Sequence, residues 1–463
     1  MEGFVRDVAQ RLPLAESVLR LFDFVCHDGF LNDVFGRHRG RSYEDLISFP
    51  TMVRLIGDAL LEHEASGRQS LLRAEERGEL PSSIRAVYAK LGRMPLALST
   101  GFLAEASARL AELFPVSGER ANVPASLDEL HVLVHDGKTV KHVEKRLKAL
   151  RNRHGTFLGG KLVISKSLTT GMVVAMGACE DGESGETLLL PDVLEQSRQA
   201  VSGPRLHVAD RQYCDLTQLQ RFAEADDHFV VRWHRKTKFF PDETWESLTG
   251  VDRRGRPYTE EWGWLGRPSD KRRRRVRRIH LKRDKEEDLI LVTDLDDPGE
   301  FPADDLLEVY LQRWGIERMF QQVSEVFHLG RLIGTTPRAT VFQSALCFLL
   351  FNMIQVIRAF VSEGQSEPVD SISTENLFCD VRRQLIAWTE VIPPQQTVEL
   401  LSTTWTSSQV ARRLRQLLHN QWSERWIKSP SNTHTAPRPH KADYPRGGHN
   451  SIYRILALPQ ATT

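Results

Sequence analysis

Two aspartates follow short apolar stretches of the chain and could share a metal ion. Asp136 comes after residues 130–135 and Asp210 after residues 205–209, and both stretches have the composition of short strands. Because strand ends meet at one edge of a sheet, two such carboxylates can lie close together. A single acid after a strand is about as often a turn residue, so the pair becomes specific only together with a third acid.

The third candidate is Glu317, on a helix expected to begin near Pro302 or Asp304. Tyr310, Arg313 and Glu317 are spaced i, i+3 and i+7, which places them on one stripe of that helix. A phenol, a cation and a carboxylate together suit an active-site wall that completes a metal site and grips a phosphate. The simpler alternative is a surface ion pair between Arg313 and Glu317. The opposite face is expected to lie in the core: Trp314, Met319, Phe320, Val323.

Three carboxylates supply hard oxygen ligands, which favour Mg²⁺ or Mn²⁺ over zinc. Two such ions at a phosphodiester are suited to in-line phosphoryl transfer. The five cysteines are odd in number and none is spaced Cys-x-x-Cys, which argues against a disulfide framework or a structural zinc site and fits the cytosol. We expect no secretion signal in 1–12, and we expect the apolar stretch 339–357 to be a buried helix, not a membrane span.

The periodicity of the chain predicts an α/β core between helical flanks. The expected order is three strands, a helix, a strand, a helix and a strand, followed by a further strand and the Glu317 helix. The expected strands are 130–135, 161–167, 171–179, 205–209, 229–233 and 289–293, and the expected helices between them are 188–199 and 216–223.

We expect five regions along the chain. Residues 1–125 are helical, either a plain bundle or a DNA-end-binding domain. Residues 126–233 and 288–360 are the two parts of the core. Residues 234–287 form a β-rich insertion, whose basic run 271–278 favours a phosphate-binding surface over a solvated arm. Residues 361–463 form a helical region with a disordered basic tail at 429–446.

The sequence resembles the insertion-sequence-four family of cut-and-paste DDE transposases, from about residue 130 to 357. The Tyr-Arg-Trp-Ile-Glu cluster is the most specific part of the resemblance. The matching stretches are VHDGKT at 134–139, VADR at 208–211, FVVR at 229–232, and Tyr310-x-x-Arg313-Trp314-x-Ile316-Glu317-x-x-Phe320.

This resemblance implies a ribonuclease-H-like core in which Asp136, Asp210 and Glu317 hold two divalent ions, Mg²⁺ or Mn²⁺. It also implies that Tyr310, Arg313 and Arg232 hold DNA phosphates near the cut. The family pattern has a Lys where this chain has Ser324, so that contact lacks its charge. Arg331 replaces it only if the helix continues that far.

The resemblance implies a DNA transposase of the bacterial cytoplasm, associated with the nucleoid when bound to DNA. Its partners would be the terminal inverted repeats of its element and target DNA, engaged by a homodimer on paired ends, with no membrane involved. Two alternatives stay open. One is a decayed transposase that binds DNA without cutting it, which Ser324 favours. The other is a non-transposing nuclease of the same fold.

Overall fold

The computed structural model describes residues 2–61, 65–115, 123–141, 147–284, 286–327, 329–401, 405–428 and 448–458. Its first part is helical, as the sequence predicts. Amphipathic segments there pack their apolar faces inward, with Leu14, Met52 and Phe102 almost fully buried. The helices are α1 (Glu2–Arg11), α2 (Pro13–Cys26), α3 (Asp28–His38), α4 (Phe49–Leu61), α5 (Gly67–Glu76), α6 (Ile84–Leu91) and α7 (Leu96–Ala111).

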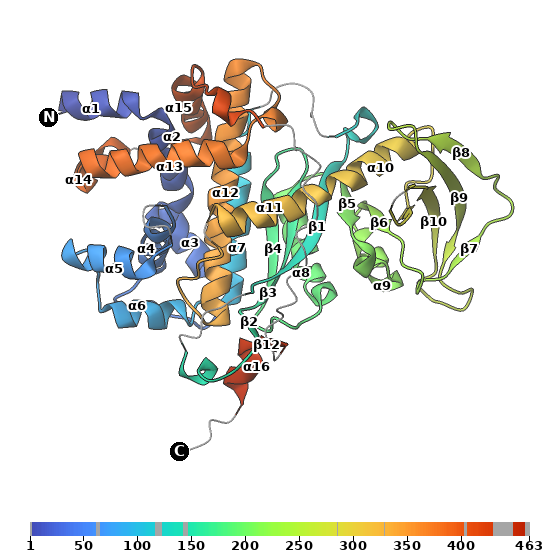
Figure 1. The fold of residues 1–463 in the computed structure, drawn as a ribbon, viewed down its shortest axis with the longest axis horizontal. Helices are drawn as coiled ribbons and strands as arrows, with labels where there is room; N and C mark the ends of the chain where they lie inside the picture. The colour runs from blue at the N-terminus through green and yellow to red at the C-terminus, as the bar shows by residue number, and fades with distance from the viewer. Residues whose placement is uncertain are drawn as a thin grey trace.

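A mixed sheet of ten strands forms the second part of the molecule (Figure 1). Its order is β4-β3-β1-β5-β6-β11-β10-β9-β7, and β8 pairs with β9. The strands are β1 (His131–Thr139), β3 (Lys161–Ser167), β4 (Val173–Cys179), β5 (Arg205–Ala209), β6 (His228–Arg232), β7 (Phe239–Pro241), β8 (Leu248–Val251), β9 (Pro257–Leu265), β10 (Arg274–Leu281) and β11 (Leu289–Thr293).

Strand β1 lies at the centre of the first half of this sheet. It pairs antiparallel with β3, which forms the expected hairpin with β4, and parallel with β5, which in turn pairs parallel with β6. Helices α8 (Leu190–Ala200) and α9 (Leu216–Phe222) make the crossovers between these strands. The predicted strand and helix order is therefore confirmed. The sequence did not predict β2 (Thr156–Leu158), which pairs with β12 (His449–Ser451).

Four strands, β7 to β10, lie within the region 234–287 that was expected to be a β-rich insertion. Strands β7 to β10 extend the core sheet as one antiparallel surface, because β10 pairs with β11 and β11 pairs with β6. Figure 1 shows this curved half of the sheet at the end of the molecule away from the N-terminal helices. The insertion is thus tied through β11 to the strand that carries Arg232.

The helix expected to carry Glu317 is divided in two, α10 (Ala303–Gln312) and α11 (Trp314–Glu325). Arg313 between them keeps helical angles, with φ −51° and ψ −35°. The tighter hydrogen bonds Arg313 N to Tyr310 O and Ile316 N to Arg313 O mark this junction. Together α10 and α11 run across the sheet in Figure 1. Tyr310 lies on α10 and Glu317 on α11, and the two helices run in nearly the same direction.

Helix α12 (Pro337–Gln365) is the central packing element. It is long and apolar enough to cross a membrane, but its apolar window is entirely buried within the protein. Asn352 on this helix donates to Ser107 of α7 at 2.9 Å and to the Val173 carbonyl of β4 at 2.8 Å. The buried-helix prediction is confirmed, and α12 joins the N-terminal helices to the sheet.

Further helices follow α12: α13 (Thr374–Val391), α14 (Pro394–Leu401), α15 (Ser407–Leu418) and α16 (Ile452–Ala457). One hydrophobic core extends from Ala9 to Ile455 and includes side chains of α2, α7, β1 and α12. The N-terminal helices therefore share a core with the sheet, and the boundaries at 125 and 360 stay predictions. The tail expected to be disordered, 429–446, lies outside the described residues.

Candidate active site

Asp136 and Asp210 lie at the same level on neighbouring strands. The parallel pairing of β1 and β5 aligns Val134 with Val208, and each aspartate follows its valine by two residues. Asp210 comes directly after β5, as expected. The sequence predicted that Asp136 follows its strand. It lies within the strand instead, because β1 continues to Thr139 through its pairing with β3. The equal offset is what places both carboxylates at one edge of the parallel pair.

Arg313 connects Asp136 with Glu317. Its guanidinium lies 3.7 Å from the Asp136 carboxylate and 3.5 Å from the Glu317 carboxylate, and only 6% of the Arg313 side chain is exposed. The Glu317 side chain is 46% exposed. The surface ion pair considered from the sequence therefore exists, but it is one part of a cluster that extends to the first aspartate.

The other face of α11 is mostly in the core, as predicted. Met319, Phe320 and Val323 are buried. Trp314 is the exception, with 53% of its surface exposed, so its assignment to the core was wrong. It begins α11 directly after the junction at Arg313, and the Arg313 guanidinium lies 5.5 Å from its ring centroid. Because the turn at this junction is tighter than that of an α-helix, regular helical spacing did not predict correctly that Trp314 is exposed.

Burial raises the pKa of Asp136 to about 6. The charge of Arg313 and a hydrogen bond from the Gly137 N–H act against that rise, whereas the carboxylates of Glu186 and Glu317 add to it. The side chain is only 16% exposed. Asp136 is thus a desolvated carboxyl with two acidic neighbours, an arrangement that a bound cation would stabilise.

Tyr310 Oη and Arg313 Nε are among the buried polar atoms that have no hydrogen-bond partner within the described residues, although the Arg313 guanidinium and the Tyr310 phenol influence each other electrostatically. Burial raises the pKa of Tyr310 to about 12, with Arg313 opposing the rise and Asp210 adding to it. The phenol therefore keeps its proton and can donate. Because unsatisfied buried donors are costly, a phenol and a guanidinium side by side fit an incoming anion such as a phosphate.

Arg232, the third expected phosphate contact, lies on β6. Its guanidinium forms an ion pair of 2.7 Å with Glu287, and Glu287 is 71% exposed. The charge of Arg232 lowers the pKa of Tyr310, which places the two side chains within electrostatic reach.

Glu186 is a fourth carboxylate at the site, and the sequence did not predict it. It lies directly over Gly137, where a β-carbon would collide with its carboxyl group. Lys161 holds it with an ion pair of 2.9 Å, Gln212 donates to it, and its side chain is 14% exposed. The signal in the sequence was the glycine after Asp136, which leaves room for this contact.

Lys138 is a second residue to which the sequence assigned no role. It lies two positions after Asp136 on β1, and its ammonium lies 5.3 Å from the ring centroid of Phe320 on α11. It is partly buried and forms no ion pair with any described residue. Ser324, one turn after Phe320, donates to the Phe320 carbonyl at 2.7 Å. Helix α11 ends at Glu325, so it does not carry Arg331 onto this face.

Several cations of the basic run 271–278 are engaged within the insertion, and contact of this run with phosphate stays a prediction. Arg277 is fully buried and paired with Glu260, because its strand position points into the core of the insertion. Other guanidinium groups in the run pair with acids and cover aromatic rings. These pairs are Arg274 with Asp294, Arg275 with Asp296 and Arg278 with Glu261, and the stacks include Arg273 on Trp264 and Arg278 on Phe239.

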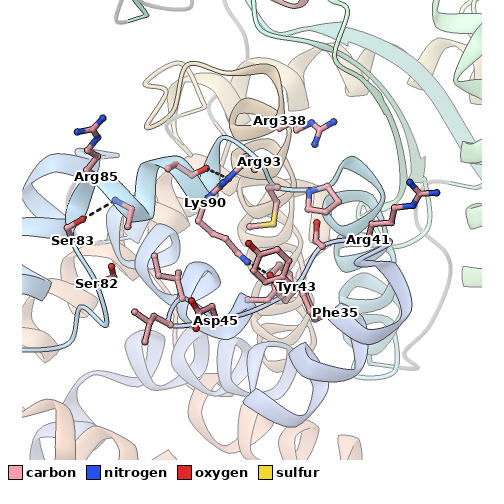
Figure 2. A pocket seen from close by; sticks show the side chains of 18 residues that line it. Phe35, Arg41, Tyr43, Asp45, Ser82, Ser83, Arg85, Lys90, Arg93 and Arg338 are labelled. Carbon is pink, nitrogen blue, oxygen red and sulfur yellow. Dashed lines mark hydrogen bonds between the residues drawn. The ribbon is translucent and has the colours of Figure 1, made fainter.

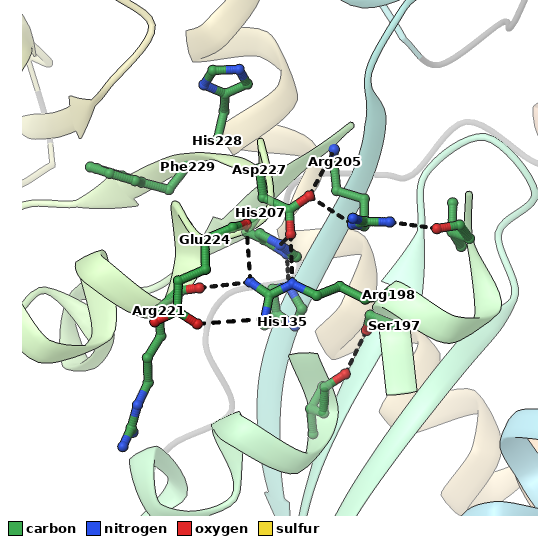
Figure 3. Close-up of polar contacts among 12 residues, drawn as sticks. His135, Ser197, Arg198, Arg205, His207, Arg221, Glu224, Asp227, His228 and Phe229 are labelled. Carbon is green, nitrogen blue, oxygen red and sulfur yellow. Dashed lines mark hydrogen bonds and ion pairs between the residues drawn. The ribbon is translucent and has the colours of Figure 1, made fainter. Parts of the chain in front are cut away.

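A buried polar chain joins His135 of β1, His207 of β5 and Asp227 just before β6 (Figure 3). His135 Nε2 is 2.8 Å from His207 Nδ1, and His207 Nε2 is 3.1 Å from Asp227. Arg198 and Arg205 donate to the same Asp227 carboxylate, at 2.9 and 2.7 Å. His135 and Asp227 are both buried and tie β1, β5 and the start of β6 together.

The electrostatics of this chain follow from its burial. Burial lowers the pKa of His135 far below its ordinary value, and the charges of His207 and Arg198 add to that effect. Burial alone would raise the pKa of Asp227, but hydrogen bonds from His207 and Arg198 and the charge of Arg205 hold it below its ordinary value. The network therefore consists of two uncharged histidines and the Asp227 carboxylate, which accepts hydrogen bonds from Arg198 and Arg205.

The described residues contain no group of three His, Cys, Asp or Glu side chains at a spacing that could hold a metal ion. Among the three proposed carboxylates, Asp136, Asp210 and Glu317, the Arg313 guanidinium lies between the first and the last. The donor set nevertheless fits a hard divalent cation, since all its atoms are carboxylate oxygens and Asp136 is desolvated beside further acids. The five cysteines, all free, offer no competing zinc or disulfide chemistry.

Comparison with known proteins identifies similarity in the core. Residues 128–353 match the family model of the transposase DDE domain. A probable transposase for insertion sequence element IS5377 from Geobacillus stearothermophilus is 24% identical over 206 residues, 44% of this chain and 50% of that protein. The chain thus spans about half the length of this relative. All the predicted site residues lie within the matched stretch.

Among solved structures, the chain is similar to a piggyBac transposase in a synaptic complex with hairpin DNA. The similarity covers 85% of this chain and 76% of that one, with 12% sequence identity and a TM-score of 0.34. That score is too low to establish a shared fold. Assignment to the insertion-sequence-four family in particular stays a prediction.

Proposed function

We propose that this chain is a DNA transposase whose active site is formed by Asp136, Asp210 and Glu317. The observation that carries this proposal is the equal offset of the two aspartates from the paired residues Val134 and Val208, with Arg313 linking that edge to Glu317. The similarity of 128–353 to transposase DDE domains supports it. The strand order β4-β3-β1-β5-β6 is also the order of a ribonuclease-H-like core.

The proposed site requires two divalent metal ions, either Mg²⁺ or Mn²⁺. Asp136 and Asp210 would hold it, with Glu317 completing the ligand set. When bound there, the metal stabilises charge on the phosphate and activates the attacking oxygen. The protein contributes two prepositioned carboxylates at one level and the desolvated surroundings of Asp136, which strengthen electrostatic interactions at the site.

In this proposal the DNA phosphate near the cut is held by Tyr310, Arg313 and Arg232. Tyr310 Oη and Arg313 Nε supply unsatisfied donors, and Arg232 exchanges Glu287 for the phosphate. Lys138 supplies a further cation beside α11. In this proposal Lys138 takes over the charge that Ser324 does not provide.

The macromolecular partners are double-stranded DNA carrying the terminal inverted repeats of the element, and target DNA. One site per chain acting on two ends implies a homodimer on paired ends. The α1–α7 region shares its core with the sheet, so DNA held by these helices would be fixed in place relative to the carboxylates. The protein acts in the bacterial cytoplasm, on the nucleoid.

A cleavage assay tests this function. The substrate is a duplex carrying the inverted repeats that flank the gene, incubated with Mg²⁺ and a separate target plasmid. The intact protein should cut at the repeat boundary and join the freed 3′ end to the plasmid, and Asp210→Ala should do neither. Absence of a metal-dependent cut by the intact protein, or cutting by Asp210→Ala, would sink the proposal.

The same assay separates the alternatives. A decayed transposase, which Ser324 favours, would bind the repeats and leave them uncut. A non-transposing nuclease would cut and never join the product to the plasmid.

A further inference from the structure

The Glu186 carboxylate contacts both segments of chain that carry the proposed metal-binding aspartates. Gly137, the residue after Asp136, lies directly against it. Gln212, two residues after Asp210, donates a hydrogen bond to its Oε2 atom. The Glu186 side chain is only 14% exposed, so these contacts form in a place that is largely shielded from water. One acidic side chain therefore connects the two segments.

Lys161 supplies the counter-charge of Glu186. Its ammonium lies 2.9 Å from Glu186 Oε1 and donates to the Thr139 hydroxyl at 2.8 Å. Thr139 and Lys161 are partners in the pairing of β1 with β3, so this ion pair joins Glu186 to both strands. Because the two charged side chains are mostly buried, solvent screens their attraction less than it screens a surface ion pair. Each carboxylate oxygen of Glu186 thus has a partner, Lys161 for one and Gln212 for the other.

Glu186 approaches β1 from the face opposite the Asp136 carboxylate. Successive residues of a strand point to opposite faces of the sheet, and Glu186 occupies the space where a side chain at position 137 would lie. Both of its oxygens are already engaged. This geometry suits a residue that supports the aspartates from behind and does not suit a further metal ligand.

The Asp210 segment depends on such support because the strand pairing ends before it. The pairing of β5 with β1 ends at Val208, and its pairing with β6 ends at Ala209. Asp210 lies beyond both and precedes the 3₁₀ turn Arg211–Tyr213. Gln212 belongs to this turn, so its hydrogen bond to Glu186 holds the turn where backbone pairing no longer does.

We propose that Glu186 is a positioning residue that holds the Asp210 turn against β1 and so fixes the separation of the Asp136 and Asp210 carboxylates. The proposal rests on the proposed function, because it concerns the same two metal ligands. Gly137 is part of this arrangement. A β-carbon at that position would collide with the Glu186 carboxyl group, so an alanine there must push the carboxylate away from its partners.

Hydrogen–deuterium exchange, followed by mass spectrometry, tests whether Glu186 holds the turn. Glu186→Ala removes the carboxylate, and Gly137→Ala displaces it without removing it. Each variant should raise the exchange rate of the amides in 211–214, two of which are hydrogen-bonded within the turn. The double variant should exchange no faster than Glu186→Ala, because both substitutions break the same contact and their effects are not additive.

Mn²⁺ binding in the absence of DNA gives a second readout, followed by electron paramagnetic resonance of the free ion. Groups that orient metal ligands typically contribute about tenfold to a hundredfold to metal affinity. Glu186→Ala and Gly137→Ala should therefore weaken Mn²⁺ binding by about that factor. Glu186→Gln should lie between Glu186→Ala and the wild type, because its single amide oxygen can serve only one of the two donors.

Asp45→Ala is the control for the change in net charge. Figure 2 shows Asp45 in an open groove on the helical region, lined by α6 and the segment between α3 and α4. The residue is exposed, and its removal changes the net charge of the protein as Glu186→Ala does. Asp45→Ala should keep the exchange rate of the turn and the Mn²⁺ affinity of the wild type.

The outcomes separate this proposal from the proposed function, with all variants compared well below their melting temperatures. Faster exchange of the turn together with weaker Mn²⁺ binding supports a positioning role. Unchanged exchange in Glu186→Ala overturns it, and so does faster exchange with wild-type Mn²⁺ affinity, because the contact would then be structural only. An equal loss of affinity in Asp45→Ala also overturns it. Wild-type Mn²⁺ binding that is insensitive to Asp210→Ala contradicts the proposed function, and exchange of the turn then decides whether Glu186 holds it.

Discussion

The Arg313 guanidinium lies 3.7 Å from the Asp136 carboxylate, and it pairs with a carboxyl that burial has largely removed from water. This partner does not offset the desolvation, since the pKa of Asp136 is raised to about 6. The site therefore maintains a charge that costs stability, as expected of a functional carboxylate.

Asp136→Asn should stabilise the protein at neutral pH in EDTA. The folded pKa of about 6 lies above the ordinary value of 3.8, so the protonated form is favoured in the folded state. That contribution is complete below pH 3.8 and is lost as pH rises through 6. At pH 7 the variant should gain at most about 3 kcal/mol, and below about pH 4 the gain should vanish. Urea unfolding at several pH values measures it, and a less stable variant at pH 7 would contradict the reasoning.

Asp227→Asn should destabilise the protein strongly. The change leaves the largely buried guanidinium groups of Arg198 and Arg205 without their counter-charge, and breaking a buried ion pair costs about 3–5 kcal/mol. Because the folded pKa of Asp227 is held below its ordinary value, the destabilisation should be full above about pH 4 and shrink as pH falls further.

The neighbouring Asp226→Asn is the matched control. Asp226 is exposed and has a φ of +59°, which asparagine also tolerates. Chemical denaturation should show little change in this variant. Equal destabilisation in both variants would mean that the buried network does not depend on the Asp227 charge.

Lys138→Met should lower cleavage of repeat DNA roughly tenfold to a hundredfold, the worth of one charge-assisted hydrogen bond. Lys138→Arg should keep most activity because the charge remains. In the Lys138→Met background, Ser324→Lys should recover activity, since both positions lie next to Phe320. Initial rates and DNA affinity measure this cycle, and full activity of Lys138→Met would remove Lys138 from the phosphate contacts.

The basic run in the insertion gives a paired comparison. Arg277→Met should reduce the free energy of unfolding by about 3–5 kcal/mol, because Glu260 is left as a buried, unpaired charge. Arg272→Met, at an exposed position of the same run, should leave stability within about 0.5 kcal/mol. Thermal and urea unfolding of the two variants provide the measurement. Similar stability of both would contradict the buried role of Arg277.

The sequence predicted most of the sheet because its strands have clear boundaries. Strands β5 and β11 begin and end where their apolar stretches do. Strand β1 was predicted too short because its last residues gain pairing only from β3, a contact between distant parts of the chain. Periodicity cannot reveal such a contact.

The candidate site was predictable only in part for a similar reason. The acids stood out by their position after strands and on one helix stripe. Glu186 and the His135–His207–Asp227 chain depend on how distant segments pack, and nothing in their local spacing indicates it. Trp314 is a case in which local spacing predicted a contact that does not form. Helical periodicity predicted that Trp314 lies in the core, but the tighter turn at Arg313 leaves it exposed.

The most direct measurement of the central claim is anomalous diffraction from crystals of the protein grown with Mn²⁺ and repeat DNA. We predict a Mn²⁺ peak roughly 2.1 Å from carboxylate oxygens of both Asp136 and Asp210, absent from crystals of Asp210→Ala. No peak at these carboxylates, or one that persists in Asp210→Ala, would contradict the claim that they form one metal-dependent site.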